Sequence, residues 1–121
     1  MGPSILLVDD DADIRMSVRQ LLVHEGFTVH TANDGQQALR VLEKIEPPAL
    51  ILLDYKMPVM DGKRFLAAMR ERIEWRQIPV VLLSSWTREW SGAHLEVADV
   101  LNKPVDPDVL LNTVTALVLQ S

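Results

Sequence analysis

Residues 50–62 of the chain read LILLDYKMPVMDG, and this stretch indicates the fold. Its first four residues form a continuous apolar run, which is typical of a strand buried on both faces of a parallel sheet. The run ends on Asp54, and a loop with Pro58 and Gly62 follows. In α/β proteins, ligands bind at the carboxyl ends of the strands. Asp54 is therefore the first candidate for a functional residue.

The same kind of run recurs on both sides of this stretch. Strand-sized apolar or alternating runs occupy residues 5–8, 27–32, 80–83 and 99–102. Amphipathic stretches separate them, and one short helix is expected between residues 87 and 96. Five strands alternating with five helices predict an α/β fold, a doubly wound parallel sheet with helices on both faces. We expect residues 1–121 to form a single domain, in which residues 1–4 could be a cloning remnant.

Apolar residues at helical spacing mark the inner face of each predicted helix. For the third helix they are Phe65, Leu66, Met69 and Ile73, and for the last helix Val109, Leu110, Val114, Leu117 and Val118. Asp106 and Pro107 precede the last set and favour a helix start there. We expect these apolar positions to pack against the sheet.

Composition excludes several classes of protein. The chain has 121 residues, of which 48% are hydrophobic and 24% charged, an ordinary globular balance. It has no cysteine, which excludes disulfides and thiolate metal sites and fits a reducing compartment, so we expect a cytoplasmic protein. Its net charge of -5 gives no reason to expect direct binding to nucleic acid. Its apolar runs are too short to span a membrane.

Polar residues stand at the ends of four predicted strands. Asp9 and Asp10 follow the first, Asp54 ends the third, Ser84 ends the fourth and Lys103 follows the fifth. Three carboxylates close together repel one another unless a cation is present, and Mg²⁺ suits such an oxygen-rich site. The ammonium and the hydroxyl can bind phosphoryl oxygens, and a carboxylate can act as a nucleophile on phosphorus. This set of groups is suited to phosphoryl transfer.

Each of these residues alone has an ordinary explanation, such as a helix cap, a turn or a solvated surface charge. Their joint position at successive strand ends favours function. The scattered histidines lack a partner pattern, and we interpret them as structural or surface residues: His24, His30 and His94. We interpret the tryptophans as packing or interface residues: Trp75, Trp86 and Trp90.

Several segments together resemble the receiver domains of bacterial response regulators. They are residues 5–11 (ILLVDDD), residues 54–62 (DYKMPVMDG), Ser84 and residues 103–104 (KP). The resemblance runs from about residue 5 to the last helix. It implies the flavodoxin-like strand order 2-1-3-4-5. It also implies a phosphoacceptor domain that catalyses its own phosphorylation and slow dephosphorylation, not an enzyme with a separate substrate.

The resemblance implies a role for each acidic residue. Asp54 would accept a phosphoryl group from a histidine kinase or a histidine phosphotransfer protein. Asp10, Asp54 and the backbone carbonyl of Lys56 would ligate Mg²⁺, with Asp9 acting through water or by orienting the site. The output domain or protein is unknown, no membrane is expected, and a homodimer is left open.

The remaining site residues follow the family only in part. By resemblance, Ser84 and Lys103 bind the phosphoryl group, and the peptide bond before Pro104 is cis. The family usually has an aromatic residue where this chain has Val100, and the stretch between Ser84 and Lys103 looks shorter than usual. These two differences from the family put its usual conformational switch beside the site in doubt for this chain. We expect Lys56 and Trp86 to flank the site entrance and hypothesise that Trp86 shields the acyl phosphate from water.

Three other functions remain as alternatives. The first is a receiver-like interaction module that is not phosphorylated in practice, for which the altered switch region argues. The second is a phosphatase with an aspartate nucleophile, but such enzymes generally carry a second acid where this chain has Lys56. The third is a flavin-binding protein, which acidic strand ends disfavour because they repel a phosphate.

Overall fold

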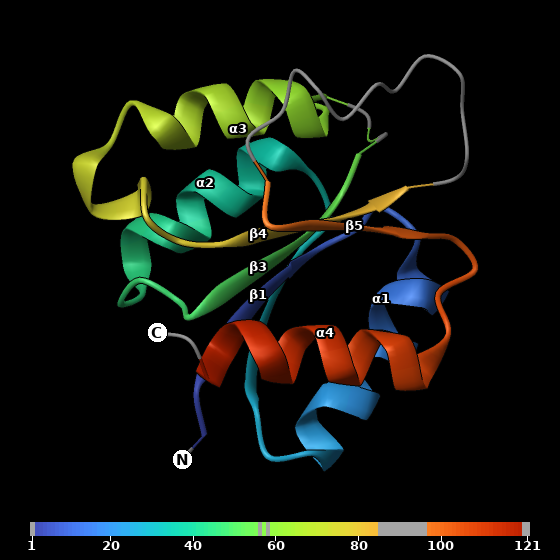
Figure 1. Ribbon diagram of the computed structural model, residues 1–121. Coiled ribbons are helices and arrows are strands. Elements are labelled where there is room, and N and C mark those ends of the chain that lie inside the picture. The colour runs from blue at the N-terminus through green and yellow to red at the C-terminus, as the bar shows by residue number, and fades with distance from the viewer. Residues whose placement is uncertain (1, 56, 58, 85–96, 120–121) are drawn as a thin grey trace.

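The sheet is parallel throughout, and its strands follow the order β2-β1-β3-β4-β5 (Figure 1). The structure is a computed structural model that describes residues 2–55, 57, 59–84 and 97–119. The strands are β1 (Ser4–Val8), β2 (Thr28–Ala32), β3 (Leu50–Asp54), β4 (Val80–Ser84) and β5 (Asp99–Asn102). The predicted strand order 2-1-3-4-5 is therefore confirmed.

Helices cover both faces of this sheet. They are α1 (Ala12–His24), α2 (Gly35–Lys44), α3 (Gly62–Arg70) and α4 (Pro107–Leu119), and a 3₁₀ turn, η1 (Ile73–Trp75), follows α3. Figure 1 shows α2 and α3 on one face and α1 and α4 on the other. The helix predicted between residues 87 and 96 lies outside the described residues.

Aspartates start each of the four α-helices that the described residues form. Asp11 caps α1, Asp34 caps α2 and Asp61 caps α3, each accepting hydrogen bonds from backbone N–H groups of the first turn. The Asp106 carboxylate accepts the N–H groups of Asp108 and Val109 at the start of α4 in the same way. Since these caps satisfy amides that the helix leaves unpaired, they also set where each loop from the sheet must end.

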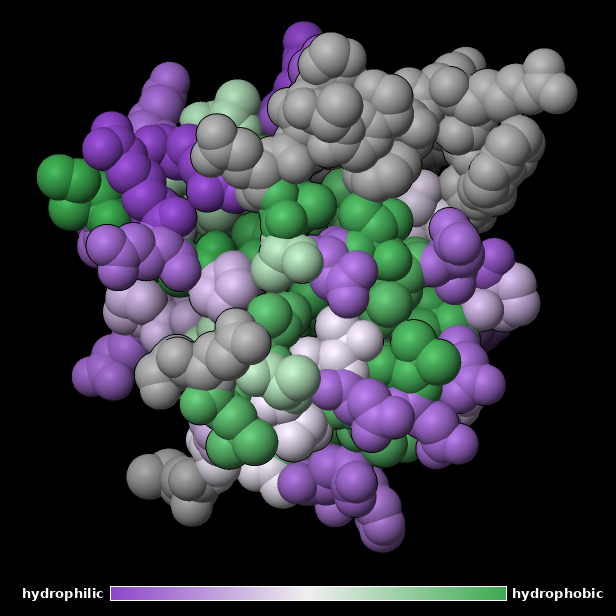
Figure 2. Space-filling view, in the orientation of Figure 1, coloured by the Kyte–Doolittle hydropathy of each residue, from purple (hydrophilic) through white to green (hydrophobic). Residues whose placement is uncertain are grey.

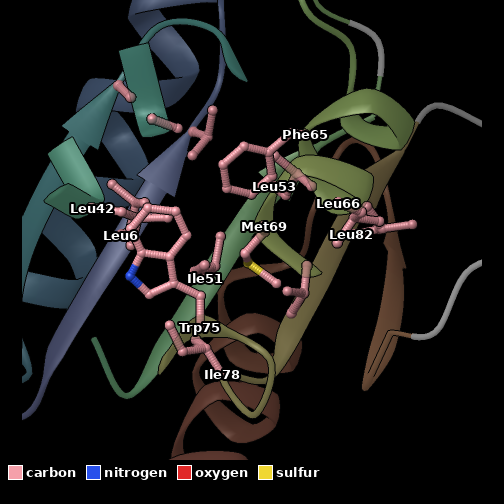
Figure 3. Close-up of a cluster of buried hydrophobic side chains, with 14 residues drawn as sticks. Leu6, Leu42, Ile51, Leu53, Phe65, Leu66, Met69, Trp75, Ile78 and Leu82 are labelled. Carbon is pink, nitrogen blue, oxygen red and sulfur yellow. The ribbon is translucent and has the colours of Figure 1, made fainter. Parts of the chain in front are cut away.

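The alternation of side chains along the strands creates two hydrophobic cores. Leu6 and Ile51 point to the face covered by α2 and α3, while Ile5 and Leu52 point to the face covered by α1 and α4. Figure 3 shows the first core, in which Leu6, Leu42, Ile51, Leu53, Phe65, Leu66, Met69, Trp75, Ile78 and Leu82 pack together. Burial on both faces explains the continuous apolar runs of the central strands.

Two predicted core positions are wrong. Helix α3 ends at Arg70, so Ile73 lies in η1 with 75% of its surface exposed, and Trp75 enters the core in its place. Val109 is 48% exposed because Leu110 and Val114 are the residues of α4 that face the sheet. The packing role predicted for Trp75 is confirmed, since it is 3% exposed.

The surface is mixed in character. Figure 2 shows hydrophobic residues exposed over α4 and β5, and hydrophilic residues gathered near α3 and η1. Val109 and Leu119 are the exposed large hydrophobic residues of α4, at 48% and 78%. Within the part of the chain that the structure describes, no helix combines the length and the apolar character needed to cross a bilayer.

Two isoleucines test this assignment of the core. Ile51 is 0% exposed in the centre of β3 and Ile73 is 75% exposed. We expect Ile51→Ala to lower the free energy of unfolding by about 2–5 kcal/mol, because it removes buried methyl groups and leaves a cavity. The matched control, Ile73→Ala, should change it by less than about 0.5 kcal/mol. Urea unfolding measures both values, and equal losses in the two variants would contradict the assignment.

Candidate functional site at the sheet edge

The strand register brings the predicted site residues to one edge of the sheet. Val8 pairs with Leu53, so the residues that follow them, Asp9 and Asp54, stand side by side. On the other side of β4, Ser84 pairs with Asn102, the residue before Lys103. The parallel strands thus deliver carboxylates, a hydroxyl and an ammonium to the edge where α/β folds bind ligands.

Hydrogen bonds hold both the backbone and the side chain of Asp9. Its side chain is fully buried, its N–H donates to the carbonyl of Ala32 at 3.1 Å, and its Oδ1 accepts the N–H of Asp11 at 2.9 Å. Its Oδ2 accepts from the Nζ of Lys103 at 3.0 Å, and its own carbonyl oxygen accepts from Nη1 of Arg15 at 2.7 Å. Each of its polar groups has a partner, so Asp9 is a rigid part of the site.

The ammonium of Lys103 joins two buried carboxylates. Its Nζ lies 3.0 Å from Oδ2 of Asp9 and 3.2 Å from Oδ1 of Asp54. Burial and then the charge of Asp9 raise the pKa of Asp54 to about 7, although Lys103 acts in the opposite direction. Burial by itself would lower the pKa of Lys103, but its hydrogen bond to Asp9 and the two carboxylate charges outweigh burial and raise it. One ammonium therefore compensates the local negative charge only in part.

Asp9, Asp10 and Asp54 form an acidic cluster that fits a magnesium ion. One carboxylate oxygen from each residue lies within 4.8 Å of the others. Asp9 and Asp54 are buried while Asp10 is exposed, so the cluster has an inner wall and an open side. Mg²⁺ is bound by few carboxylates and retains several waters, for which the open side leaves room. The donor set and its exposure therefore agree with the predicted metal.

The other predicted site residues are placed as follows. Ser84 is 5% exposed, and its carbonyl accepts the N–H of Lys103 at 2.9 Å. The Lys103–Pro104 peptide bond is cis, as predicted. Val100 is partly buried and packs against the core under α2 and α3. Two predicted residues lie outside the described residues: Lys56 and Trp86.

The loop between β3 and α3 is fixed at both ends. The N–H of Gly62 donates to the carbonyl of Tyr55 at 2.8 Å, and the N–H of Gly35 donates to that of Met60 at 3.2 Å. A side chain on Gly35 would approach Met60 to 2.9 Å, so only glycine allows this contact. Val59 has a φ of 66°, which is unfavourable for a β-branched residue, and is 68% exposed. The closure of the loop thus outweighs the backbone preference of Val59.

Arg15 contacts the backbone of the site, a role that was not predicted from the sequence. A signal was present, because Arg15 stands four residues after the helix cap Asp11. Helical side chains lean towards the N-terminus of their helix, so a long side chain at this position reaches back over the preceding loop. Arg15 thereby meets the carbonyl of Asp9.

The electrostatics of the cluster predict that Asp54→Asn stabilises the metal-free protein. The pKa of Asp54 lies at about 7, above the ordinary aspartate value of 3.8. The folded state therefore binds a proton more tightly than the unfolded state, and stability falls as the pH rises between these values. At about pH 8 the variant should gain about 1 kcal/mol, less than the full linkage value because Lys103 loses a partner, and the gain should shrink towards pH 4.

Urea unfolding in the presence of a chelator measures this gain. Asp34→Asn is the matched control, because Asn caps the start of α2 as well as Asp does. A gain for Asp54→Asn that is the same at low and high pH would contradict the assignment.

Solved structures of similar shape are receiver domains. The chemotaxis response regulator CheY4 of Vibrio cholerae matches with a TM-score of 0.88 and 32% identity, covering 97% of this chain and 99% of that chain. The receiver domain of sensor histidine kinase PA1611 from Pseudomonas aeruginosa, described with a magnesium ion coordinated in its active site cleft, matches with a TM-score of 0.89 and 26% identity. That match covers 98% of each chain.

Sequence relatives agree with this likeness. The transcriptional regulatory protein CpxR of Escherichia coli K12 is 37% identical over 120 residues, which are 97% of this chain and 50% of CpxR, so the chain spans about half the length of that relative. An uncharacterised 14.6 kDa protein of Leptolyngbya boryana is 37% identical over 113 residues, 91% of this chain and 86% of that protein. The family model of the response regulator receiver domain matches residues 5–115. The chain therefore belongs to the family of response regulator receiver domains, the receiving modules of two-component signalling.

Proposed function

We propose that Asp54 accepts a phosphoryl group from a phosphohistidine of a histidine kinase or a histidine phosphotransfer protein. The observation that carries this proposal is the contact of the buried Asp54 carboxylate with Lys103 Nζ at 3.2 Å inside the acidic cluster. A carboxylate of this kind is a nucleophile for phosphorus, and an ammonium beside it can receive the charge of the incoming group.

The proposed reaction is a simple displacement at phosphorus. An oxygen of Asp54 forms a bond to the phosphorus atom, and the bond between phosphorus and the histidine nitrogen breaks. The imidazole leaves with the electron pair of that bond, as a neutral ring when its other nitrogen carries a proton. Asp54 becomes an acyl phosphate, which is later hydrolysed when water attacks the phosphorus atom. Such transfers depend mainly on position and charge neutralisation.

The side chains around Asp54 have distinct tasks in this reaction. Lys103 binds a phosphoryl oxygen as a compact positive charge, and its contact with Asp9 at 3.0 Å keeps it beside the nucleophile. The Ser84 hydroxyl donates a hydrogen bond to another phosphoryl oxygen. Because Asp9 and Lys103 are both buried or nearly so, bulk water weakens these interactions little.

Magnesium is the proposed cofactor. Asp10 and Asp54 would hold it, with the backbone carbonyl of Lys56, and Asp9 would contribute through water or by orienting the site. When bound, the ion neutralises the carboxylates and the charge of the phosphoryl oxygens. Without it, three carboxylates within 4.8 Å would face an anionic donor, and among the described residues Lys103 is the cation that forms ion pairs with them.

The proposed biological role is a phosphorylation-dependent change of partner. We place it in the cytoplasm, where ATP-dependent kinases act, and treat residues 1–121 as one receiver unit. The residues of this chain do not identify the output domain or protein, and we propose no direct contact with nucleic acid. Val100 packs against the core where the family usually has an aromatic residue, so the signal would leave the site by another route than the usual switch.

Mass spectrometry tests the phosphoacceptor directly. After incubation with Mg²⁺ and acetyl phosphate, the intact wild-type protein is expected to gain the mass of one phosphoryl group. Asp54→Asn should gain none, because an amide is not a nucleophile for phosphorus. Asp34→Asn, a change of the same kind at the start of α2, should gain the group as the wild type does.

An unmodified wild type, tested also with a phosphorylated histidine phosphotransfer protein, would contradict the proposal. It would favour the alternative of an interaction module with a receiver fold. A gain of mass in Asp54→Asn would instead place the acceptor elsewhere.

The pKa of Asp54 predicts how magnesium binding depends on pH. A protonated carboxyl group is a poor ligand, and the pKa of Asp54 in the metal-free protein is about 7. The Mg²⁺ affinity should therefore be constant above this value and fall ~10-fold for each pH unit below it. Isothermal titration calorimetry measures the affinity. The dependence should be absent in Asp54→Asn, and a wild-type affinity that is unchanged across this range would refute the prediction.

A further inference from the structure

We propose that Arg15 is a positioning residue for the metal ligand Asp10, and that it acts through the peptide bond joining Asp9 to Asp10. The proposal rests on the proposed function, because it takes the acidic cluster to be a magnesium site. It goes beyond that function by assigning a task to a cation on α1 that touches neither the metal ligands' carboxylates nor the phosphoryl-binding groups.

The contact that carries the proposal is short and directed at the backbone. Nη1 of Arg15 donates to the carbonyl oxygen of Asp9 at 2.7 Å in a partly buried setting. A hydrogen bond from a charged donor is stronger than one between neutral groups, and this length is typical of such bonds. Among the described residues Arg15 takes part in no salt bridge. Its guanidinium group thus donates a hydrogen bond to a backbone carbonyl at the site, although acidic side chains lie close to Arg15 in the sequence.

That carbonyl belongs to the peptide unit that leads into Asp10. A peptide unit is planar and includes the Cα atom of Asp10, so holding its oxygen restricts the position of that Cα atom, from which the side chain leaves. The N–H and both carboxylate oxygens of Asp9 already have partners. Arg15 supplies the partner of the one remaining polar group of Asp9 and thereby fixes the peptide plane.

Asp10 needs this support more than its neighbours do. Asp9 and Asp54 are buried in the sheet edge, whereas Asp10 is exposed. It follows the end of β1 and precedes Asp11, the cap of α1, so it stands in the turn between two ordered elements. An exposed carboxylate in a turn has several rotamers and backbone orientations available. Restricting the backbone reduces the entropy that is lost when the ion binds.

The charge of Arg15 allows a clear test, because the loss of its charge and the loss of its positioning contact predict opposite changes in the Mg²⁺ affinity. Removal of a cation near a metal site reduces the repulsion of the ion and strengthens its binding. Removal of a group that positions a ligand weakens binding, commonly by 10–100-fold for partners outside the first ligand shell. The sign of the change in Mg²⁺ affinity therefore separates the two effects.

The experiment compares Arg15→Ala with Arg19→Ala. Arg19 lies one turn further along α1 and is exposed, so the second variant makes the same change of charge without touching the turn. By calorimetry at about pH 8, where Asp54 is ionised, Arg15→Ala should bind Mg²⁺ ~10-fold more weakly than the wild type. Arg19→Ala should bind it equally well or slightly more tightly. Arg15→Lys, which keeps the charge but has a shorter reach, should lie between the wild type and Arg15→Ala.

The dependence of phosphorylation on Mg²⁺ distinguishes positioning from a general structural role. With acetyl phosphate as donor, the Mg²⁺ concentration for half-maximal rate should rise ~10-fold in Arg15→Ala, in proportion to its affinity. The rate at saturating Mg²⁺ should stay within about twofold of the wild type, because Arg15 touches no reacting group. A variant damaged in its fold would lose the saturated rate as well.

Several results would overturn the proposal. They are an Mg²⁺ affinity of Arg15→Ala equal to or above that of Arg19→Ala, and a fall in the saturated rate with an unchanged half-saturation. If Arg15→Ala does not fold, Arg15→Lys decides, and a wild-type affinity in that variant refutes the proposal. A wild type that binds no Mg²⁺ overturns the proposed metal site itself, whereas a wild type that binds it beside an unaffected Arg15→Ala overturns only the role of Arg15.

Discussion

The contact of one ammonium with two buried carboxylates is the constraint around which this site is built. Lys103 Nζ lies 3.0 Å from Asp9 and 3.2 Å from Asp54, and both carboxylates are almost fully removed from water. Buried charges are costly unless they are paired. A single ammonium cannot neutralise three neighbouring carboxylates, and burial together with the charge of Asp9 raises the pKa of Asp54 in spite of Lys103. The site is therefore prepared for further positive charge before any ligand arrives.

The fold holds this unfavourable arrangement in place by distributing the groups over separate strands. Asp9 follows β1, Asp54 ends β3 and Lys103 follows β5. Two hydrophobic cores, one on each face, hold these strands in register, so the charged groups cannot move apart to relieve their repulsion. Stability of the sheet thus maintains a site that is electrostatically strained without a metal ion.

The acidic residues differ in how firmly they are held, and this difference suits them to separate tasks in the proposed reaction. Asp9 has a partner for every polar group and serves as a fixed support for Lys103. Asp54 is buried yet has the pKa of a group that can change its protonation near neutral pH. Asp10 faces solvent and provides the open side through which an ion and its waters can enter. The contact of Arg15 with the carbonyl of Asp9 links the peptide unit before this exposed carboxylate to helix α1.

The sequence by itself determined where along the chain the apolar strands lie and which polar residues follow them at the candidate site. Continuous runs such as residues 50–53 can be buried only between two layers of helices, and polar residues at their ends must then meet at one edge. The strand order came from the family resemblance, because pairing between strands is not encoded in any local pattern. Local periodicity also misplaced Ile73 and Val109, since helix ends and packing directions depend on neighbouring elements.

Only the tertiary structure decided how the charges are shared. That Lys103 reaches both Asp9 and Asp54, and that Arg15 reaches the backbone of Asp9, depends on distances between residues far apart or in different elements. The left-handed backbone of Val59 could not be predicted from the sequence either, because closure of its loop overrides the local preference of a β-branched residue. A sequence shows which groups are present, but interaction energies of charges and hydrogen bonds depend on separation and burial, which exist only in the folded chain.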